Sequence, residues 1–338
     1  MDILKKYIRE SLSLLFLSIF LPLFGIASIV FLIKLATVTA VIQLSILEMT
    51  KLFLFMLPEL LFYTLPISFF IAMVLTLFKL SNDNEIIVFF ALGIRPRFIL
   101  RTLFKPALFL TTILLIDFFV LFPHAKTLSN NFISHKKSEA KFNLGASEFG
   151  HKFGDWLLYI GNENLNETYS DVVLFNKKQN DEIFIEAKNA QIINEAGVLR
   201  LKLSDGEGYS YSKQKFTQIN FETMFINDST NNDLEEYKTP IEYWFYDESK
   251  KRIKMFTINI LFSLFPLLSL FLALSIGIVH ARHQKAKIYL FLFLGIIIYD
   301  SMAVGLQIVG SFYAIALQII LWLGITYTIY KKAIVAKF

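Results

Sequence analysis

Long apolar runs alternate with short charged segments along this chain, and one polar stretch interrupts them near the middle. A helix needs about 20 predominantly apolar residues to cross the hydrocarbon core of a bilayer. Six runs reach that length if one acidic residue is allowed in some of them. They cover residues 11–33, 53–78, 99–122, 255–279, 287–307 and 311–331. The pattern therefore predicts an integral membrane protein with six helical spans, the last two forming a tight hairpin.

The polar stretch, residues 124–249, has a different periodicity. Short segments of alternating apolar and polar residues replace the helical pattern, as expected for strands with one buried face. The segments that predict strands are 156–160, 171–175, 182–186, 190–194, 198–203, 208–211 and 216–225. Residues 161–162, 195–197 and 205–206 carry turn signals. Many short strands at close spacing favour an all-β sandwich or roll.

These patterns predict three domains along the chain. Residues 1–123 hold spans one to three, residues 124–249 form the inserted β domain, and residues 250–338 hold spans four to six. The first span is too long for a removable signal peptide and lacks a small-residue cleavage site. The predicted fold class is therefore a six-span α-helical membrane protein with an inserted all-β domain.

A short helix is predicted between the second and third spans, at residues 82–92. Asn82 can cap its N-terminus, with Glu85 three residues later completing a capping-box pair, and Gly93 followed by Pro96 predicts its end. The apolar run between these signals is too short to cross a bilayer and too apolar for a loop in water. We expect it to dock in a groove of a soluble partner. The alternative is a helix that lies on the membrane interface.

The placement of basic residues predicts the topology. They gather on one side of the predicted spans, as Lys5, Lys6, Arg9, Lys79, Arg95, Arg97, Arg101, Lys105, Arg282, Lys285, Lys287, Lys331, Lys332 and Lys337. The opposite short loops contain only Lys34 and Lys51. Because cytoplasmic loops carry the excess of Lys and Arg, both termini and the helix at 82–92 are expected in the cytoplasm. The β domain is then periplasmic.

Composition excludes several kinds of site. The chain has no cysteine, which rules out disulfides and thiolate metal ligands. His280 and His283 have no acidic neighbour, so no metal site is predicted. No GxxxxGK(S/T) phosphate loop and no nucleophile–base pair is present. We therefore expect a protein that is not an enzyme and binds no cofactor itself. The net charge of +5 is explained by topology and indicates no nucleic-acid partner.

Five segments of the chain resemble the LptF/LptG permease family, the membrane half of the ATP-driven exporter that extracts lipopolysaccharide from the inner membrane. In chain order they are ILKKYIRESL, LPELLFYTLPISFFIAMVLTLFKLSNDNEIIVFFALGIRP, DFFVLFPHAK, IEAKNAQIINEAGVLRLKLSDGEGY and KKRIKMFTINILFSLFPLLSLFLALSIGIVHARHQKAK. Together they span residues 3–287 and occur in the family's order. The PELLFYTLPISFF segment and the R-x-x-K loop after the fourth span look more like the LptF half, whereas the turn between spans five and six lacks an expected proline.

The resemblance implies several partners. One is a paralogous permease that forms a heterodimer with this chain, and another is a dimer of cytoplasmic ATPase subunits that uses ATP and Mg²⁺. A third is a single-span accessory protein with its own β-jellyroll. The resemblance also implies a jellyroll-like fold for the β domain. Lipopolysaccharide would enter between spans one and five of the two halves, then pass through the periplasmic jellyrolls toward the outer membrane.

The resemblance also assigns roles in the helix at 82–92. In the family, the acid at the position of Glu85 contacts a basic residue of the ATPase. Phe89 and Phe90 would be the apolar anchors in the ATPase groove. For Glu85 the alternative is a capping acid alone, because a carboxylate in the first turn of a helix is favoured by the helix dipole.

Basic residues on the periplasmic side are candidate ligands for anions. Lys34 ends the first span and matches basic residues that the family carries near the lipid A phosphates, which a cation binds strongly at low dielectric. The alternative is an interfacial lysine that reaches toward the lipid head groups. A second basic cluster precedes the fourth span and is expected to bind membrane head groups. It consists of Lys250, Lys251, Arg252 and Lys254.

Apolar candidates for lipid binding lie in two places. Met302 and Leu306 recur at roughly helical spacing on the fifth span and would line a lipid cavity, with core packing as the alternative. Ile183, Ile185 and Leu201 lie on predicted strands. Their side chains would line a groove for acyl chains if the β domain is open, or fill the core of a closed sandwich.

Three acidic residues lie in or near the spans: Glu59, Asp117 and Asp300. Unpaired charge there is costly and is functional by default, but the three lack the pairing of a proton relay, so structural or gating roles are expected. Two other kinds of protein compete with an export permease. A membrane sensor or scaffold with a ligand-binding β domain would need a cytoplasmic output domain, and a secondary transporter would need inverted repeats and midplane charges.

Overall fold

The computed structural model describes residues 2–39, 44–140, 151–153, 156–164, 168–178, 181–195, 198–212, 215–227, 237–246, 250–278, 285–308 and 310–336. The chain divides into two compact units. The helical unit comprises residues 1–36, 49–128 and 237–338, and the β unit comprises residues 37–48 and 129–236. A helical membrane protein with an inserted β domain is the fold class that the hydrophobic pattern predicts, and the structure confirms it.

The first half of the chain contains three long helices and one short one. Their elements, in order, are α1 (Asp2–Thr39), α2 (Ile46–Asn82), α3 (Glu85–Ala91), α4 (Pro96–Ile116), the π-helical turn η1 (Asp117–Leu121) and α5 (Phe122–Ala140). Because α4, η1 and α5 follow one another without a break, they make one continuous span from Pro96 to Ser134. Each of the three long helices is apolar enough to cross a membrane.

The second half contains a bent span and a helical hairpin. Its elements are the π-helical turn η2 (Glu242–Tyr246), α6 (Lys250–Leu268), α7 (Leu270–Gly277), α8 (Lys285–Gly305), the 3₁₀ turn η3 (Leu306–Ile308), α9 (Ser311–Tyr330) and the π-helical turn η4 (Lys331–Val335). The axes of α6 and α7 differ by 44° across Ser269. The predicted hairpin between α8 and α9 is present, with Gly310 at a φ of 126° that favours glycine. Five described helices and this bent pair account for up to six spans.

Buried side-chain hydrogen bonds join the last three spans. The fully buried Tyr299 of α8 donates its hydroxyl to the Leu261 carbonyl oxygen of α6 at 2.5 Å, and its own carbonyl accepts from Gln318 Nε2 of α9 at 3.1 Å. Thr257 Oγ1 of α6 donates to Gln307 Oε1 at 3.0 Å. In lipid no hydrophobic effect drives helices together, so packing and interhelical hydrogen bonds such as these determine which helices pair.

An aromatic cluster closes the end of the helical unit where α6 begins. Trp244 of η2 is fully buried and donates from Nε1 to the Phe119 carbonyl oxygen at 3.3 Å. The rings of Phe118, Phe122 and Phe256 lie 5.9, 6.3 and 5.4 Å from the Trp244 ring. The cluster joins η1, η2 and α6 into one packed block and satisfies the one polar atom of the indole.

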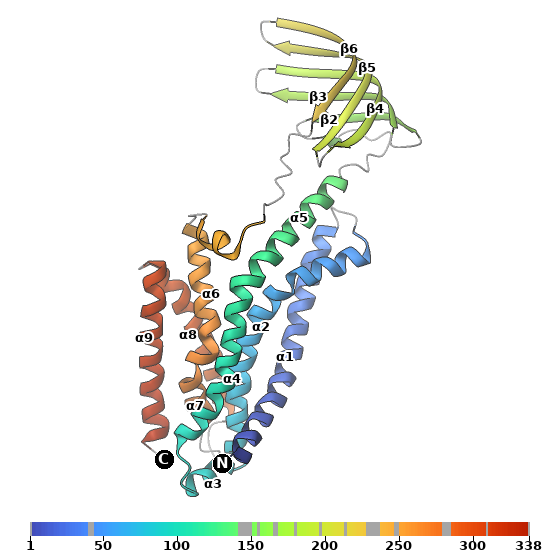
Figure 1. The fold of residues 1–338 in the computed structure, drawn as a ribbon. Coiled ribbons are helices and arrows are strands. Elements are labelled where there is room, and N and C mark those ends of the chain that lie inside the picture. The colour runs from blue at the N-terminus through green and yellow to red at the C-terminus, as the bar shows by residue number, and fades with distance from the viewer. Residues whose placement is uncertain are drawn as a thin grey trace. The chain divides into compact units, whose positions relative to one another are not determined.

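In contrast, α1 is packed over only part of its length. Ile8 and Leu12 are buried near its N-terminus, and the Phe16 ring lies edge-on to the Phe69 ring of α2 at 5.9 Å. None of the residues in the most apolar 18-residue window of α1 is buried. Figure 1 shows α1 and α9 at opposite edges of the helical unit.

The β unit contains one antiparallel sheet in the order β1-β2-β3-β4-β5-β6, so neighbouring strands are consecutive in the chain. The strands are β1 (His151–Phe153), β2 (Trp156–Asn164), β3 (Thr168–Lys178), β4 (Asp181–Glu195), β5 (Val198–Ser212) and β6 (Lys215–Asn227). Residues 37–48 also belong to this unit, in which the Glu48 carboxylate accepts from Lys136 Nζ of α5 at 2.6 Å. A six-stranded meander is therefore the arrangement of the described strands.

The sheet is creased along one line that crosses its strands. On β4 the buried side chains are Ile185 and Ala187, then Ala190, with two exposed residues in succession between them. The same three-residue step occurs on β3 between Tyr169 and Val172, which pairs with Ala187. Side chains of a regular strand alternate between the two faces with a period of two. The three-residue step shifts this alternation by one residue at the line, and buried side chains occur on both sides of it. Figure 1 shows that the strands of this sheet are bent.

Two non-glycine residues in the left-handed region form part of this crease. Asp171 on β3 has a φ of 56° and Asp205 on β5 has a φ of 53°, a conformation that Asp tolerates better than most residues. Two predicted turns, at residues 161–162 and 205–206, are wrong because they lie inside β2 and β5. At the crease the sequence has residues typical of turns, and the alternation of buried and exposed side chains shifts by one position, but the strand continues. Two predicted strands are therefore one strand in β4, and two others are one strand in β5.

Candidate functional site

The short helix α3 lies between the second and third spans, as predicted, but it begins three residues later. Asn82 is the last residue of α2, so it is no N-cap, and that part of the prediction is wrong. Asn84 is the N-cap, with a φ of 60° and no side-chain capping bond. The end is as predicted: Gly93, at a φ of 78°, donates its N–H to the Phe90 carbonyl oxygen at 3.0 Å.

The two faces of α3 differ in what they contact. Ile86 is buried, and Phe90 is half-buried and packs against the core of the helical unit. The outward face is also apolar: Ile87 is 42%, Val88 53% and Leu92 74% exposed. The predicted anchor Phe90 therefore attaches α3 to its own bundle. Sequence reasoning missed that Val88 and Leu92 provide the apolar surface available to another molecule.

Glu85, at the start of α3, has a partner within the chain. Its carboxylate oxygen Oε1 accepts a hydrogen bond from the Tyr7 hydroxyl of α1 at 2.9 Å. This bond ties the first turns of α1 to the first residue of α3, across 78 positions of sequence. Phe89, the other predicted anchor, is half-buried. No local pattern pairs Tyr7 with Glu85, so sequence reasoning did not include Tyr7 in the site.

The candidate lipid-binding residues of the helical unit are not brought together within this chain. Lys34 is exposed on α1. Met302 is half-buried on α8 and packs against the core, and Leu306 is half-buried in the 3₁₀ turn that follows α8. In Figure 1, α1 lies at one edge of the helical unit and α8 lies among the last helices, near the opposite edge.

The acidic residues of the spans differ in burial. Asp117 is 6% exposed at the start of η1, whereas Glu59 and Asp300 are half-buried. Among the four basic residues that begin α6, Arg252 already has a partner. Its guanidinium lies 4.7 Å from the Tyr243 ring centre and donates from Nη1 to the Tyr243 carbonyl oxygen at 3.0 Å. Arg252 therefore holds η2 against α6, which differs from the head-group role expected for the cluster.

The candidate groove residues of the β unit lie in its core. Ile185 is 5% and Leu201 1% exposed, and Ile183 packs against the same cluster while partly buried. This cluster includes side chains from both sides of the crease, such as Leu174 and Leu203. In the described state these side chains fill a closed core.

Across the described residues, no group of three His, Asp or Glu side chains is arranged to hold a metal ion. His280, His283 and most of the R-x-x-K loop lie outside the described residues.

Nearly the whole chain corresponds to one known family. The family model described as lipopolysaccharide export system permease LptF/LptG matches residues 6–332. The chain belongs to this family. A comparison with curated proteins gives no match. LptF/LptG proteins are the membrane permease subunits of the lipopolysaccharide exporter, so this chain is a multi-pass permease of the inner membrane. The loop helix and the β unit lie within the match, as do all but the outermost residues of the first and last spans.

Proposed function

We propose that this permease is driven by a separate cytoplasmic ATPase that docks on α3. The observation that supports it best is the exposed apolar surface of Val88, on the seven-residue helix α3 between two spans, and of Leu92 at the C-cap of α3. Apolar side chains this exposed are costly in water and are typical of an interface. The ATPase supplies ATP and Mg²⁺ chemistry, and this permease chain binds neither.

The orientation follows from where the basic residues lie. In Figure 1, α1 begins and α9 ends at the end of the helical unit that holds α3. That end also carries Lys5, Arg97 and Lys331. By the positive-inside rule we assign both termini and α3 to the cytoplasm. The β unit is then periplasmic, where it receives lipopolysaccharide and passes it along a bridge of similar domains.

A second permease chain completes the proposed lipid path. None of the residues in the most apolar 18-residue window of α1 is buried. On α8, Phe293 is 62% exposed and Val304 is 52% exposed. A paralogous chain that pairs with this one would bring its own equivalent of α8 beside α1. Lys34 would then face Met302 and Leu306 counterparts of the other chain across a lateral opening. We place lipid A phosphates near Lys34 and acyl chains near these apolar positions. The single-span accessory protein joins this assembly, and we assign this chain to the LptF half.

Assembly with the ATPase tests the role of α3. The variants Val88→Asp and Leu92→Asp each put a charge on the outward face and should abolish co-purification of the ATPase with the full-length permease pair. Leu92→Met is the matched control, because it keeps an apolar side chain of similar volume. Glu85→Lys should also weaken assembly. Retention of the ATPase at wild-type levels by both Asp variants would remove the case for docking on α3.

Photocrosslinking tests the role of the β unit. A photoreactive amino acid at Leu201 should label lipopolysaccharide in the purified exporter only while ATP is hydrolysed, since the closed core must open first. The exposed Phe225 on β6 is a control position outside that core. If lipopolysaccharide is not crosslinked at Leu201 during ATP hydrolysis, these side chains only pack the core and do not bind lipid. A sensor or scaffold would show neither ATPase assembly nor turnover-dependent labelling.

A further inference from the structure

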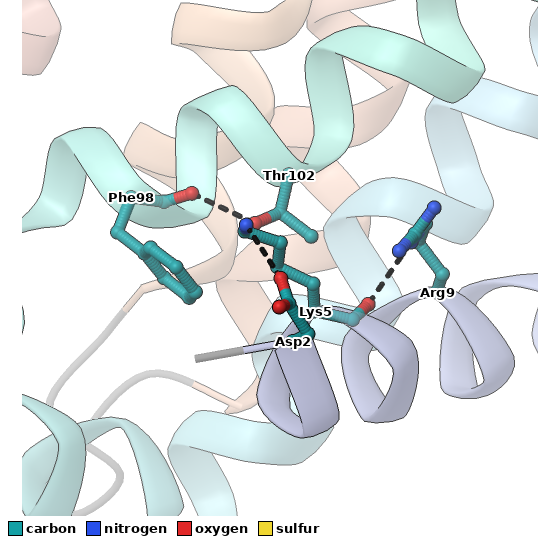
Figure 2. Close-up of polar contacts among 5 residues, drawn as sticks. All are labelled: Asp2, Lys5, Arg9, Phe98 and Thr102. Carbon is teal, nitrogen blue, oxygen red and sulfur yellow. Dashed lines mark hydrogen bonds and ion pairs between the residues drawn. The ribbon is translucent and has the colours of Figure 1, made fainter.

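A basic cavity lies between the first turns of α1 and α4, on the same end of the helical unit as α3. Its volume is about 310 Å³. Four of its lining side chains are cations and the others are Phe98 and Thr102 of α4; the cations are Lys5, Arg9, Arg101 and Lys105. Figure 2 shows the Lys5 amino group beside Phe98 and Thr102, with Arg9 one turn farther along α1. The four cations come from two helices, so the cavity depends on how α1 packs against α4.

The carboxylates near this cavity do not balance its charge. Asp2 accepts from Lys5 Nζ at 3.0 Å. Among the described residues, Arg101 and Lys105 form no ion pair, and both are exposed. Arg9 donates from Nε to the Lys5 carbonyl oxygen at 3.1 Å, which orients its guanidinium (Figure 2). The two terminal amino groups of Arg9 form no hydrogen bond with the described residues. At least three cations are thus left to bind an anion.

An apolar groove adjoins this cavity and shares Arg9 with it. The groove has a volume of about 750 Å³ and lies between α1, α2 and α4. Leu12, Phe16 and Leu65 are among the apolar side chains along it, while Lys6 and Glu10 lie at its polar end. The Lys6 and Glu10 side chains are 3.8 Å apart, so their charges offset each other. A groove lined by hydrocarbon next to a cluster of cations is complementary to a molecule with an acyl chain and an anionic head.

We propose that this site binds an anionic glycerophospholipid, with its phosphate in the basic cavity and an acyl chain in the groove. Basic pockets between spans on the cytoplasmic side are suited to anionic head groups. The lipid would fill the space between α1 and its neighbours, where few protein side chains meet, and so hold α1 in place. It differs from the exported lipid, which we place at the opposite end of the spans. Only the assignment of this site to the cytoplasmic leaflet rests on the proposed topology.

Labelling at one cysteine can measure this binding, because the chain has no cysteine of its own. Phe109 lines the groove and is 69% exposed, so a bimane label on Phe109→Cys would sit at the groove's rim without filling it. The labelled full-length protein, purified with the partners that accompany it, is placed in vesicles of phosphatidylcholine. Brominated phosphatidylglycerol or brominated phosphatidylcholine is then added to both leaflets, and quenching of bimane gives their relative association constants.

We expect phosphatidylglycerol to bind at least about fivefold more tightly than phosphatidylcholine, since one Lys or Arg near a lipid phosphate accounts for about that factor. The double variant Arg101→Gln/Lys105→Gln should lose this preference. Its matched control is Lys331→Gln/Lys332→Gln, which removes two exposed charges outside the cavity and should keep it. Arg101→Lys/Lys105→Arg should also keep it, which separates loss of charge from loss of folding.

Several results would overturn the proposal. Equal quenching by the two lipids, or a preference that survives Arg101→Gln/Lys105→Gln, would show that the cavity selects no anion. Equal loss in both double variants would indicate general surface charge. Abolition of the preference by millimolar inorganic phosphate would indicate a site for free anions. A label that no brominated lipid quenches would indicate a groove filled by protein. None of these results depends on lipopolysaccharide export. The proposed phospholipid site and the proposed export function can therefore be refuted independently.

Discussion

Gly277 lies where α7 approaches α2 closely, and we predict that adding one methyl group there loosens the pair. A Cβ at Gly277 would lie 2.6 Å from Leu77 Cβ and 2.8 Å from the Val74 carbonyl oxygen. Ordinary van der Waals contact begins near 3.4 Å. Neither neighbour is the flexible end of a side chain, so the helices themselves must move apart.

The magnitude follows from the cost of overpacking. Extra methylene-sized volume in a well-packed core costs about 1–3 kcal/mol of unfolding free energy. The higher helix propensity of Ala returns up to about 1 kcal/mol. We therefore expect Gly277→Ala to lower the free energy of unfolding by about 1–2 kcal/mol. Because α2 leads directly into α3, a displaced α2 should also weaken assembly with the ATPase.

The assay is reversible unfolding of the full-length chain in mixed micelles, followed by far-UV circular dichroism. Gly324→Ala is the matched control, since Gly324 lies inside α9 and nothing is within 4 Å of the added Cβ. The control should be neutral or slightly stabilised. The reasoning would be refuted if Gly277→Ala were as stable as Gly324→Ala, because the close approach would then be unimportant to packing.

Three further outcomes follow from single contacts. Tyr299→Phe removes the hydroxyl that reaches α6, and should cost about 0.6 kcal/mol in the same unfolding assay; an unchanged value would mean the bond adds nothing. Gly206→Ala puts a Cβ against the Phe221 ring and should lower the thermal stability of the β unit more than that of the helices. Hydrogen bonds from the Thr239 backbone N–H and hydroxyl lower the pKa of Glu242. Their stabilisation is present above the unfolded pKa of about 4.3 and is lost as the pH falls through the lower folded pKa. Thr239→Val should raise that pKa toward the ordinary value, as measured by carboxyl-carbon NMR, and no change would contradict the capping geometry.

The spans were predictable because a bilayer demands long apolar runs, and this demand is visible in any window of the sequence. The bend between α6 and α7 was not. Pro266 lies three residues before the break at Ser269, but α2 contains two prolines and α4 another, and both remain single helices. A proline removes one backbone donor, and the neighbouring helices decide whether the helix then bends.

Capping signals were informative only where the preceding residues were free to leave a helix. Thr239 and Glu242 form a reciprocal capping box, with the Thr239 N–H 2.8 Å from the Glu242 carboxylate. Ser45 and Glu48 form another. The pattern at Asn82 has the same spacing, yet the apolar periodicity of α2 continues through it. The contact between Tyr7 and Glu85 carries no sequence signal at all, since only the tertiary fold places α1 beside α3.

The creased sheet makes the lengths of its strands depend on one another. On β3 and β4 two outward residues follow one another at the line, and the register with the neighbouring strands is unchanged on either side. Deleting one residue from β4 near Lys188 would turn every side chain beyond that point to the opposite face. Such a deletion could be tolerated only if β3 and β5 lost a residue at the same place. In related sequences, insertions and deletions in this unit should therefore collect in the hairpins, while the distance from each hairpin to the crease stays constant.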